Sequence, residues 1–140
     1  MRIVAPMMIL ILMTSTLAGC TGEDEITESV FVDEDEWVGY TIDCWDSCNI
    51  GVSVEVDYGP KIDVYVMSQM NYENFKECDS FYYYDEVSRS GTYGYSGSTT
   101  LEEGDYVIVF DNSDCGDTSP PTNGVNDEAG ITYTLTVEVG

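Results

Sequence analysis

Several stretches of this sequence alternate apolar and polar residues with a period of two, and this pattern constrains the fold most. The clearest is 131–139, where Ile, Tyr, Leu, Val and Val alternate with Thr, Thr, Thr and Glu. The same alternation runs through 50–58, with Tyr58 on the apolar face, and resumes at 62–66 after a Gly-Pro turn. Because successive side chains of a strand point to opposite faces, each stretch predicts a strand with one buried face.

The remaining strands are predicted from weaker patterns. The stretch 106–110 is almost continuously apolar, which favours a central strand buried on both faces. The Val30-Phe31-Val32 triplet would add an edge strand, and further strands are expected at 37–43, 81–85 and 92–101. Short strands broken by Gly, Asn and Asp predict an all-β fold, a jelly-roll-like antiparallel sandwich of about 7–8 strands.

Helical periodicity is almost absent from the sequence. Only 71–78 fits a single helical turn, which would direct Tyr72 and Phe75 toward the core. Because the alternation typical of strands begins at Trp37 and continues to the end of the sequence, the β-sandwich domain is expected to span residues 37–140.

The N-terminal residues 1–19 are organised like an export signal. Arg2 precedes an apolar run at 7–13, and small and polar residues then lead to the sequence LAGC, which ends at Cys20. The run is shorter than the ~20 residues of a membrane-spanning helix, so we expect a signal-peptide helix. The LAGC box resembles the lipobox of prokaryotic lipoproteins. This resemblance implies cleavage before Cys20 and a lipid on its thiol, which would hold the chain on the outer face of the cytoplasmic membrane. The alternative is an ordinary secretory signal followed by a chance cysteine.

Residues 20–36 are expected to be a lipid-anchored tether. Eight acidic side chains occur in 21–36. Their mutual repulsion favours a solvated spacer that lifts the domain off the membrane.

The charge balance excludes several classes of function. The chain has 27 acidic and 4 basic residues and no histidine, a net charge of −23, which becomes −24 if removal of 1–19 takes Arg2 away. Such a surface repels nucleic acid. Without histidine there is no Ser-His-Asp or Cys-His catalytic site and no imidazole zinc site, so we expect no enzyme. An acidic, lysine-poor surface is similar to proteins of salt-adapted microbes, and it favours a halophilic, archaeal origin over a bacterial one.

Five cysteines are present, and Cys20 would carry the lipid. The remaining even number predicts two disulfides in an exported chain. We favour the pairs Cys44–Cys48 and Cys78–Cys115, while pairings that join the 44–48 segment to the later loops stay open. A redox or metal role for the CWDSC motif is disfavoured, because its spacing is C-x3-C and no histidine assists it.

Three segments of the domain, taken in order along the chain, make up a layout that recurs in known domains. They are IDVYVMSQMNYENF at 62–75, LEEGDYVIVFDN at 101–112 and the closing Thr-Val strand. The layout resembles the GOLD-type and pre-peptidase C-terminal-type β-sandwich domains of secreted or membrane-tethered proteins, over about 37–139. Eukaryotic GOLD proteins continue into a coiled coil and a membrane helix, which do not occur up to Gly140. The resemblance therefore implies a fold and a binding role, with no catalytic residues.

Two groups of residues are candidate binding sites. The loop 111–117 is dense in the oxygen ligands that calcium prefers, although its spacing does not fit an EF-hand; the candidate ligands are Asp111, Asn112, Asp114 and Asp117.

Exposed tyrosines are common at recognition sites for protein or sugar. Three consecutive tyrosines cannot all face a core, and two more would share one face of the next strand; the candidates are Tyr82, Tyr83, Tyr84, Tyr93 and Tyr95.

The sequence as a whole predicts a lipid-anchored, non-catalytic binding module of the cell envelope. Its partner would be an envelope protein or a glycan, with calcium as the one candidate cofactor. The alternatives are a structural or spacer protein without a discrete ligand, and a calcium-dependent adhesion module.

Overall fold

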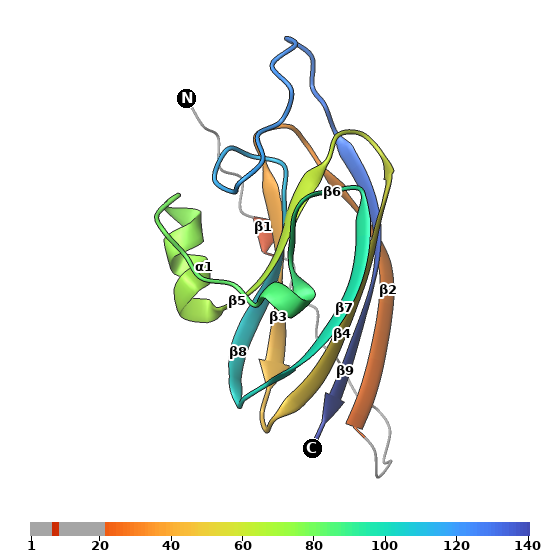
Figure 1. Ribbon diagram of the computed structural model, residues 1–140, viewed down its shortest axis with the longest axis vertical. Helices are drawn as coiled ribbons and strands as arrows, with labels where there is room; N and C mark the ends of the chain where they lie inside the picture. The colour runs from red at the N-terminus through yellow and green to blue at the C-terminus, as the bar shows by residue number, and fades with distance from the viewer. Residues whose placement is uncertain (1–6, 9–21) are drawn as a thin grey trace.

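The computed structural model describes residues 7–8 and 22–140, which form a sandwich of two β-sheets (Figure 1). In this described part the strand orders are β1-β3-β8-β5-β6 and β2-β9-β4-β7. The strands are β1 (Met7–Met8), β2 (Gly22–Val32), β3 (Trp37–Cys44), β4 (Cys48–Tyr58), β5 (Ile62–Ser68), β6 (Arg89–Thr92), β7 (Gly94–Leu101), β8 (Gly104–Asp111) and β9 (Ala129–Val139). The all-β sandwich predicted from the sequence is confirmed.

The strand order is that of a jelly roll. Leaving β1 aside, the chain changes sheet at every connection except that between β5 and β6. All pairs among these eight strands are antiparallel. This interleaving places neighbours in sequence on opposite layers, as in a double-sheet jelly roll.

The strands predicted from strict alternation all form. The almost continuously apolar stretch 106–110 lies in β8, between β3 and β5, and is buried throughout. The expected strand at 92–101 divides at Tyr93, because the chain leaves one sheet as β6 and enters the other as β7.

The acidic segment is a strand rather than a spacer over most of its length. Residues 22–32 form β2, which pairs with β9 from Gly22 to Val32 without a break. The expected edge strand at 30–32 is confirmed, but the tether assigned to 20–36 is wrong for 22–32. Val30 and Val32 enter the core, while Glu25 and Glu28 are exposed, so a high local charge does not prevent pairing.

The strand expected at 81–85 does not form. Residues 81–84 are a loop, followed by the 3-10 helix η1 (Asp85–Val87). The rings of Phe81 and Tyr83 instead pack on Tyr65, at 5.1 and 4.7 Å between ring centroids. The expected helical turn does form, as α1 (Gln69–Lys76), with Tyr72 and Phe75 buried.

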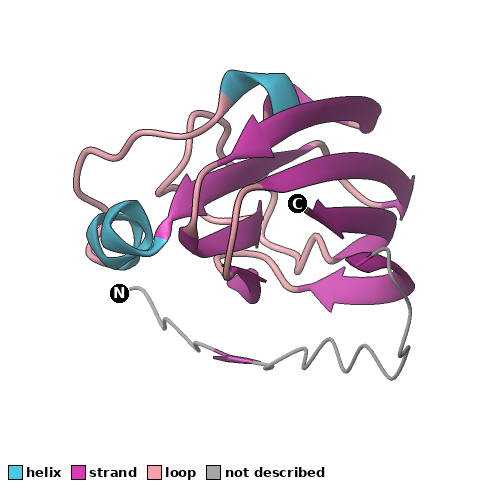
Figure 2. Ribbon diagram, turned by 90° about the horizontal axis from the view of Figure 1, so that it is seen from below, coloured by secondary structure: helices cyan, strands magenta, loops and turns pink. Residues whose placement is uncertain are grey.

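Two apolar clusters stabilise the fold. The larger fills the space between the sheets and includes Tyr40, Phe110 and Tyr133, whose rings are in contact. The smaller lies between α1 and the outer face of the β3-β8-β5 sheet, where α1 covers the sandwich from outside (Figure 2). Its buried members are Trp37, Tyr65, Met67, Tyr72, Phe75, Val107 and Val109.

Both favoured disulfides are present. Cys44 and Cys48 close the hairpin between β3 and β4, with their Cα atoms 5.8 Å apart. Cys78 and Cys115 join the loop after α1 to the loop after β8, with a Cα separation of 4.9 Å. Two disulfides in a small domain are typical of an oxidising, extracytoplasmic compartment.

The predicted signal peptide lies mostly outside the described residues. Met7–Met8 alone are described there, and they form the short strand β1 beside Val38 and Gly39 of β3 rather than part of a helix. Cys20 lies outside the described residues. No helix in the described ranges is long and apolar enough to cross a membrane.

Candidate functional site

The outer face of the β2-β9-β4-β7 sheet carries an ordered array of hydroxyl groups. Strand register aligns its outward residues in rows, one residue from each strand. Three successive rows are Glu25-Thr136-Gly51-Ser98, Thr27-Thr134-Ser53-Ser96 and Ser29-Thr132-Glu55-Gly94. Threonine and serine dominate because their small side chains alternate with the buried apolar residues of the same strands.

The hydroxyls of this face bond to one another and to nearby amide and carboxylate oxygens. Thr27 and Thr134 are linked at 2.9 Å between their Oγ1 atoms. Thr100 donates to Asn49 Oδ1 at 2.7 Å, and Thr132 donates to Asp57 Oδ2 at 2.6 Å. A hydroxyl both donates and accepts, so each group keeps a further hydrogen-bonding position open to solvent or a ligand.

Two exposed rings lie at one end of this face. Phe31 of β2 is 61% exposed and Tyr58 of β4 is 49% exposed. Both residues pair with Gly130 of β9, and their ring centroids are 6.3 Å apart. A Cβ on Gly130 would lie 2.3 Å from the Tyr58 ring, so the glycine leaves room for that ring to lie over β9. Phe31 and Tyr58, here called the aromatic platform, form an apolar end to a polar face, with their rings tilted by 36° to each other.

The hydroxyl of Tyr58 is fixed at the rim of the platform. It donates to Glu128 Oε1 at 2.9 Å. Burial, this hydrogen bond and the negative charge of Glu128 raise the pKa of Tyr58, so the ring stays neutral. The platform therefore presents an uncharged ring beside a carboxylate acceptor.

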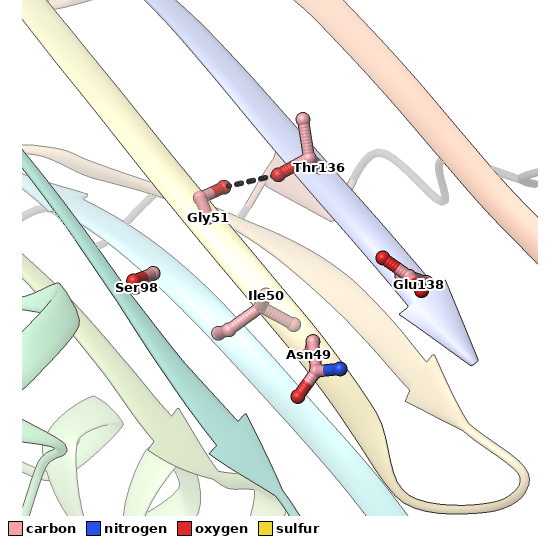
Figure 3. A pocket seen from close by; sticks show the side chains of 6 residues that line it. All are labelled: Asn49, Ile50, Gly51, Ser98, Thr136 and Glu138. Atoms are coloured by element: carbon pink, nitrogen blue, oxygen red, sulfur yellow. Dashed lines mark hydrogen bonds between the residues drawn. The ribbon is translucent and has the colours of Figure 1, made fainter. Parts of the chain in front are cut away.

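A shallow depression of about 210 Å³ lies toward the other end of the same face (Figure 3). It forms where Gly51 of β4 lacks a side chain, and Thr136 Oγ1 donates to the Gly51 carbonyl at 3.5 Å. The lining residues come from β4, β7 and β9: Asn49, Ile50, Gly51, Ser98, Thr136 and Glu138. Platform, hydroxyl rows and depression form a strip along the strands that suits an extended hydroxyl-rich ligand.

The platform was not predicted, because the alternation at 50–58 places Tyr58 on the buried face. The pairing of β4 with β9 shifts register between Val56 and Tyr58, and this irregularity turns Tyr58 outward. The Gly-Pro turn that follows Tyr58 was the available signal, since bulges occur near strand ends.

The three consecutive tyrosines have three different environments. Tyr82 is 83% exposed, Tyr83 is half-buried on Tyr65, and Tyr84 contacts Tyr106 at 5.8 Å between ring centroids. Of the three, Tyr82 alone is largely exposed. Tyr82, Tyr83 and Tyr84 therefore do not form one exposed aromatic surface.

Tyr93 and Tyr95 also point to different surroundings. Tyr93 is 58% exposed, with Lys61 Nζ 5.6 Å from its ring centroid. Tyr95 packs against the core, and its hydroxyl donates to the Val87 carbonyl at 2.7 Å. Burial raises the pKa of Tyr95.

The acidic loop 111–117 is held by internal hydrogen bonds. Asp111 Oδ1 accepts from the Ser113 N–H at 2.9 Å and from its hydroxyl at 2.5 Å. The Asn112 amide donates to the carbonyls of Val32 and Asp127, and Asp117 Oδ2 accepts from the Ser90 hydroxyl. Asp114 is exposed.

Within the described residues no group of three or more acidic, Cys or His side chains is arranged to hold a metal ion. Calcium binding by Asp111, Asn112, Asp114 and Asp117 stays a prediction, and its test is given in the Discussion.

Asp63 is a buried carboxylate near this loop that was not predicted from the sequence. It was expected on a polar face of its strand, but it is fully buried and accepts from the N–H groups of Gly91 and Thr118. Both faces of β5 are covered, because α1 and the 81–84 loop pack on the outer one. The carboxylate thus holds β6 and the loop that follows β8 against the start of β5.

Comparisons with known proteins place the chain near other small β domains. No protein family and no curated protein matches the sequence. Among solved structures, the pre-peptidase C-terminal domain of a Bacillus anthracis collagenase is similar at 14% identity and a TM-score of 0.45, over 79% of this chain and 88% of that one.

Two further structures are similar over most of the chain. The periplasmic g-type lysozyme inhibitor of Aeromonas hydrophila matches at 8% identity and a TM-score of 0.49, over 96% of this chain and 99% of that one. A protein of Bacillus endospore appendages, described as disulfide-linked pili, matches at 12% identity and 0.40, over 90% and 100%.

Proposed function

We propose that this protein is an exported, lipid-anchored, non-catalytic module that binds a glycan along the outer face of the β2-β9-β4-β7 sheet. The observation that carries the proposal is the aromatic platform of Phe31 and Tyr58 at the end of a hydroxyl-lined face. Sugar rings combine an apolar C–H face with hydroxyl groups, so they match an aromatic ring beside rows of donors and acceptors.

The length of the strip favours an oligosaccharide over a single sugar. Gly51, at the depression, and Tyr58, at the platform, are seven residues apart on β4, which corresponds to roughly 23 Å along a strand. A ligand that reaches both features must contain several sugar units.

The negative charge of this face favours neutral or amino-substituted glycans over anionic ones. Glu25, Glu55 and Glu138 lie on the same face, and the chain as a whole is strongly acidic. An anionic polysaccharide would be repelled, whereas a neutral or amino-substituted one would not. Carboxylates are also strong acceptors for sugar hydroxyls.

Anchoring on the outer face of the cytoplasmic membrane is supported by the LAGC box at Cys20 and by the two disulfides. The strong acidity supports a halophilic, archaeal envelope as its setting. Intact-mass analysis of the protein purified from membranes should show a lipid on Cys20. The Cys20→Ser variant should carry none, and wild-type protein without a lipid would refute the anchor.

Glycan binding is tested with immobilised neutral polysaccharides, a mannan, a glucan and a galactan, in molar salt. The double variant Phe31→Ala/Tyr58→Ala should lose binding to whichever polymer the wild type retains. Tyr82→Ser is the matched control, because it removes an exposed ring at a different site. Loss of binding in Tyr82→Ser alone would move the site to that loop. No retention on any polymer, together with capture of an envelope protein, would favour the protein partner instead.

A further inference from the structure

The folded domain begins close to the predicted lipid-attachment residue. Strand β2 starts at Gly22, two residues after Cys20. Two residues of chain span at most about 7 Å, whatever their conformation. A lipid on Cys20 would therefore hold the start of β2 directly at the bilayer surface, with no spacer between them.

The hairpin closed by Cys44 and Cys48 lies at the same end of the sandwich. Gly22 pairs with Val139, and Val139 pairs on its other side with Cys48. Adjacent strands are ~4.8 Å apart, so Gly22 lies roughly 10 Å from this hairpin. The N–H of Gly140 also donates to the Ser47 carbonyl at 3.0 Å. Figure 1 shows the start of β2, the C-terminus and the β3–β4 hairpin together at one end.

Trp45 stands exposed at the tip of this hairpin. Its side chain is 69% exposed, whereas Trp37, the other tryptophan, is 2% exposed beneath α1. The disulfide closes the loop, and the Ser47 N–H donates to Asp46 Oδ1 at 2.8 Å. A constrained loop loses little conformational entropy when its tip binds, so an exposed indole here is well placed to contact a surface.

We propose that the Trp45 side chain inserts into the interfacial region of the bilayer in which the lipid on Cys20 is embedded. The 44–48 hairpin would then be the end of the sandwich that contacts the membrane. The inference rests on the lipid anchor proposed above. Tryptophan is enriched at membrane interfaces, because its ring is apolar and its N–H bonds to polar headgroups. The aromatic platform then faces away from the membrane, since Phe31 lies nine residues beyond Gly22, roughly 30 Å along β2.

Acidic side chains lie at the same end of the sandwich as Trp45, and they make its contact with the membrane depend on salt. Exposed carboxylates at this end include Asp43, Asp46, Glu102, Glu103, Asp105 and Glu138. They repel anionic headgroups at low ionic strength, and salt screens the repulsion within a few ångströms at molar concentration. The contact of Trp45 with an anionic bilayer is therefore expected to strengthen as salt rises.

The test uses the full lipidated protein, with the lipid verified by intact mass, in phosphatidylcholine vesicles with and without brominated acyl chains. Bromine quenches an indole within the bilayer. Wild-type emission should fall in brominated vesicles, and the loss should vanish in Trp45→Phe, where only buried Trp37 emits. The matched control is Trp45→Phe/Phe31→Trp, which places an exposed indole at the opposite end of β2 and should not be quenched.

The outcomes separate the two proposals. A lipidated protein whose Trp45 is not quenched, or in which the indole at position 31 is quenched equally, overturns the orientation and leaves the anchor intact. Purified protein without a lipid on Cys20 overturns both.

Discussion

Asp63 and Asp111 face each other across β5 and β8, and both side chains are fully buried. Asp63 Oδ2 and Asp111 Oδ2 lie 2.3 and 2.6 Å from the position that a Cβ would take on Gly116, so the two oxygens are within about 5 Å of each other. Burial, and then the charge of Asp63, raise the pKa of Asp111 to about 7, while hydrogen bonds from Ser113 and from the Gly116 backbone oppose the rise.

This pair predicts a pH-dependent stability. Because the pKa of Asp111 is higher in the folded protein than its unfolded value of 3.8, the folded state binds the proton more tightly. Ionisation of Asp111 therefore lowers the free energy of unfolding as the pH rises from about 4 to about 7. The Asp111→Asn variant removes this cost and should be more stable than wild type above pH 7, by roughly 2–4 kcal/mol.

The measurement is chemical denaturation of both proteins from pH 4 to pH 8 in constant salt. The control is Asp105→Asn, which changes an exposed carboxylate of the same strand and should follow the wild-type profile. Parallel profiles for Asp111→Asn and wild type would show that the carboxyl of Asp111 is not the group that titrates.

Salt should stabilise the domain. The mature chain would carry a net charge of −24, and self-repulsion in the compact state weakens as counterions screen it. The Tm is expected to rise steadily between low and molar sodium chloride, with the same rise in potassium chloride. A constant Tm across this range would contradict the role assigned to self-repulsion.

The effect of calcium on the Tm distinguishes general charge screening from binding at a specific site. Millimolar calcium should raise the Tm only slightly if the 111–117 loop serves as a hydrogen-bonded structure. If calcium alone reproduces the full effect of molar salt, and Asp114→Asn/Asp117→Asn abolishes this, the predicted calcium site is correct.

The disulfides should contribute unequally. Cys78 and Cys115 are 37 positions apart, against 4 for Cys44 and Cys48. The chain-entropy relation gives about 4 kcal/mol for the longer loop and about 2 kcal/mol for the shorter one. Cys78→Ser/Cys115→Ser should therefore lower the free energy of unfolding more than Cys44→Ser/Cys48→Ser. Equal losses, or a non-reduced peptide map that links Cys48 to Cys78, would contradict this.

The aromatic side chains under and beside the 81–84 loop should differ sharply in their effect on stability. Phe75 is fully buried between Trp37 and Phe81, so Phe75→Ala should cost about 3–5 kcal/mol through the cavity that it leaves. Tyr82→Ala should stay within about 0.5 kcal/mol, because its ring is exposed. Thermal melts of the two variants in molar salt measure both effects, and a comparable loss in both would show that Tyr82 is packed.

The local pattern of the sequence was sufficient for most of the strands. Alternation at 50–58 and 131–139 identified β4 and β9, because the side-chain period of a strand is a property of the strand itself. The favoured disulfides pair cysteines that lie beyond the ends of the strands predicted from the sequence. The fold class is therefore readable from short-range information.

The tertiary structure decided which strands meet and which faces remain exposed. The acidic segment 22–32 became a strand only because β9 offers it a free edge along its whole length. Tyr58 turned outward through a shift in register with β9, and Asp63 met Asp111 because β5 and β8 align those two positions. The sequence alone determined most of the strands and the helix α1, since local sterics and burial set them. Register and layer packing placed Trp45 beside the start of β2, formed the aromatic platform and buried the carboxylate pair, because these relationships join residues far apart in the chain.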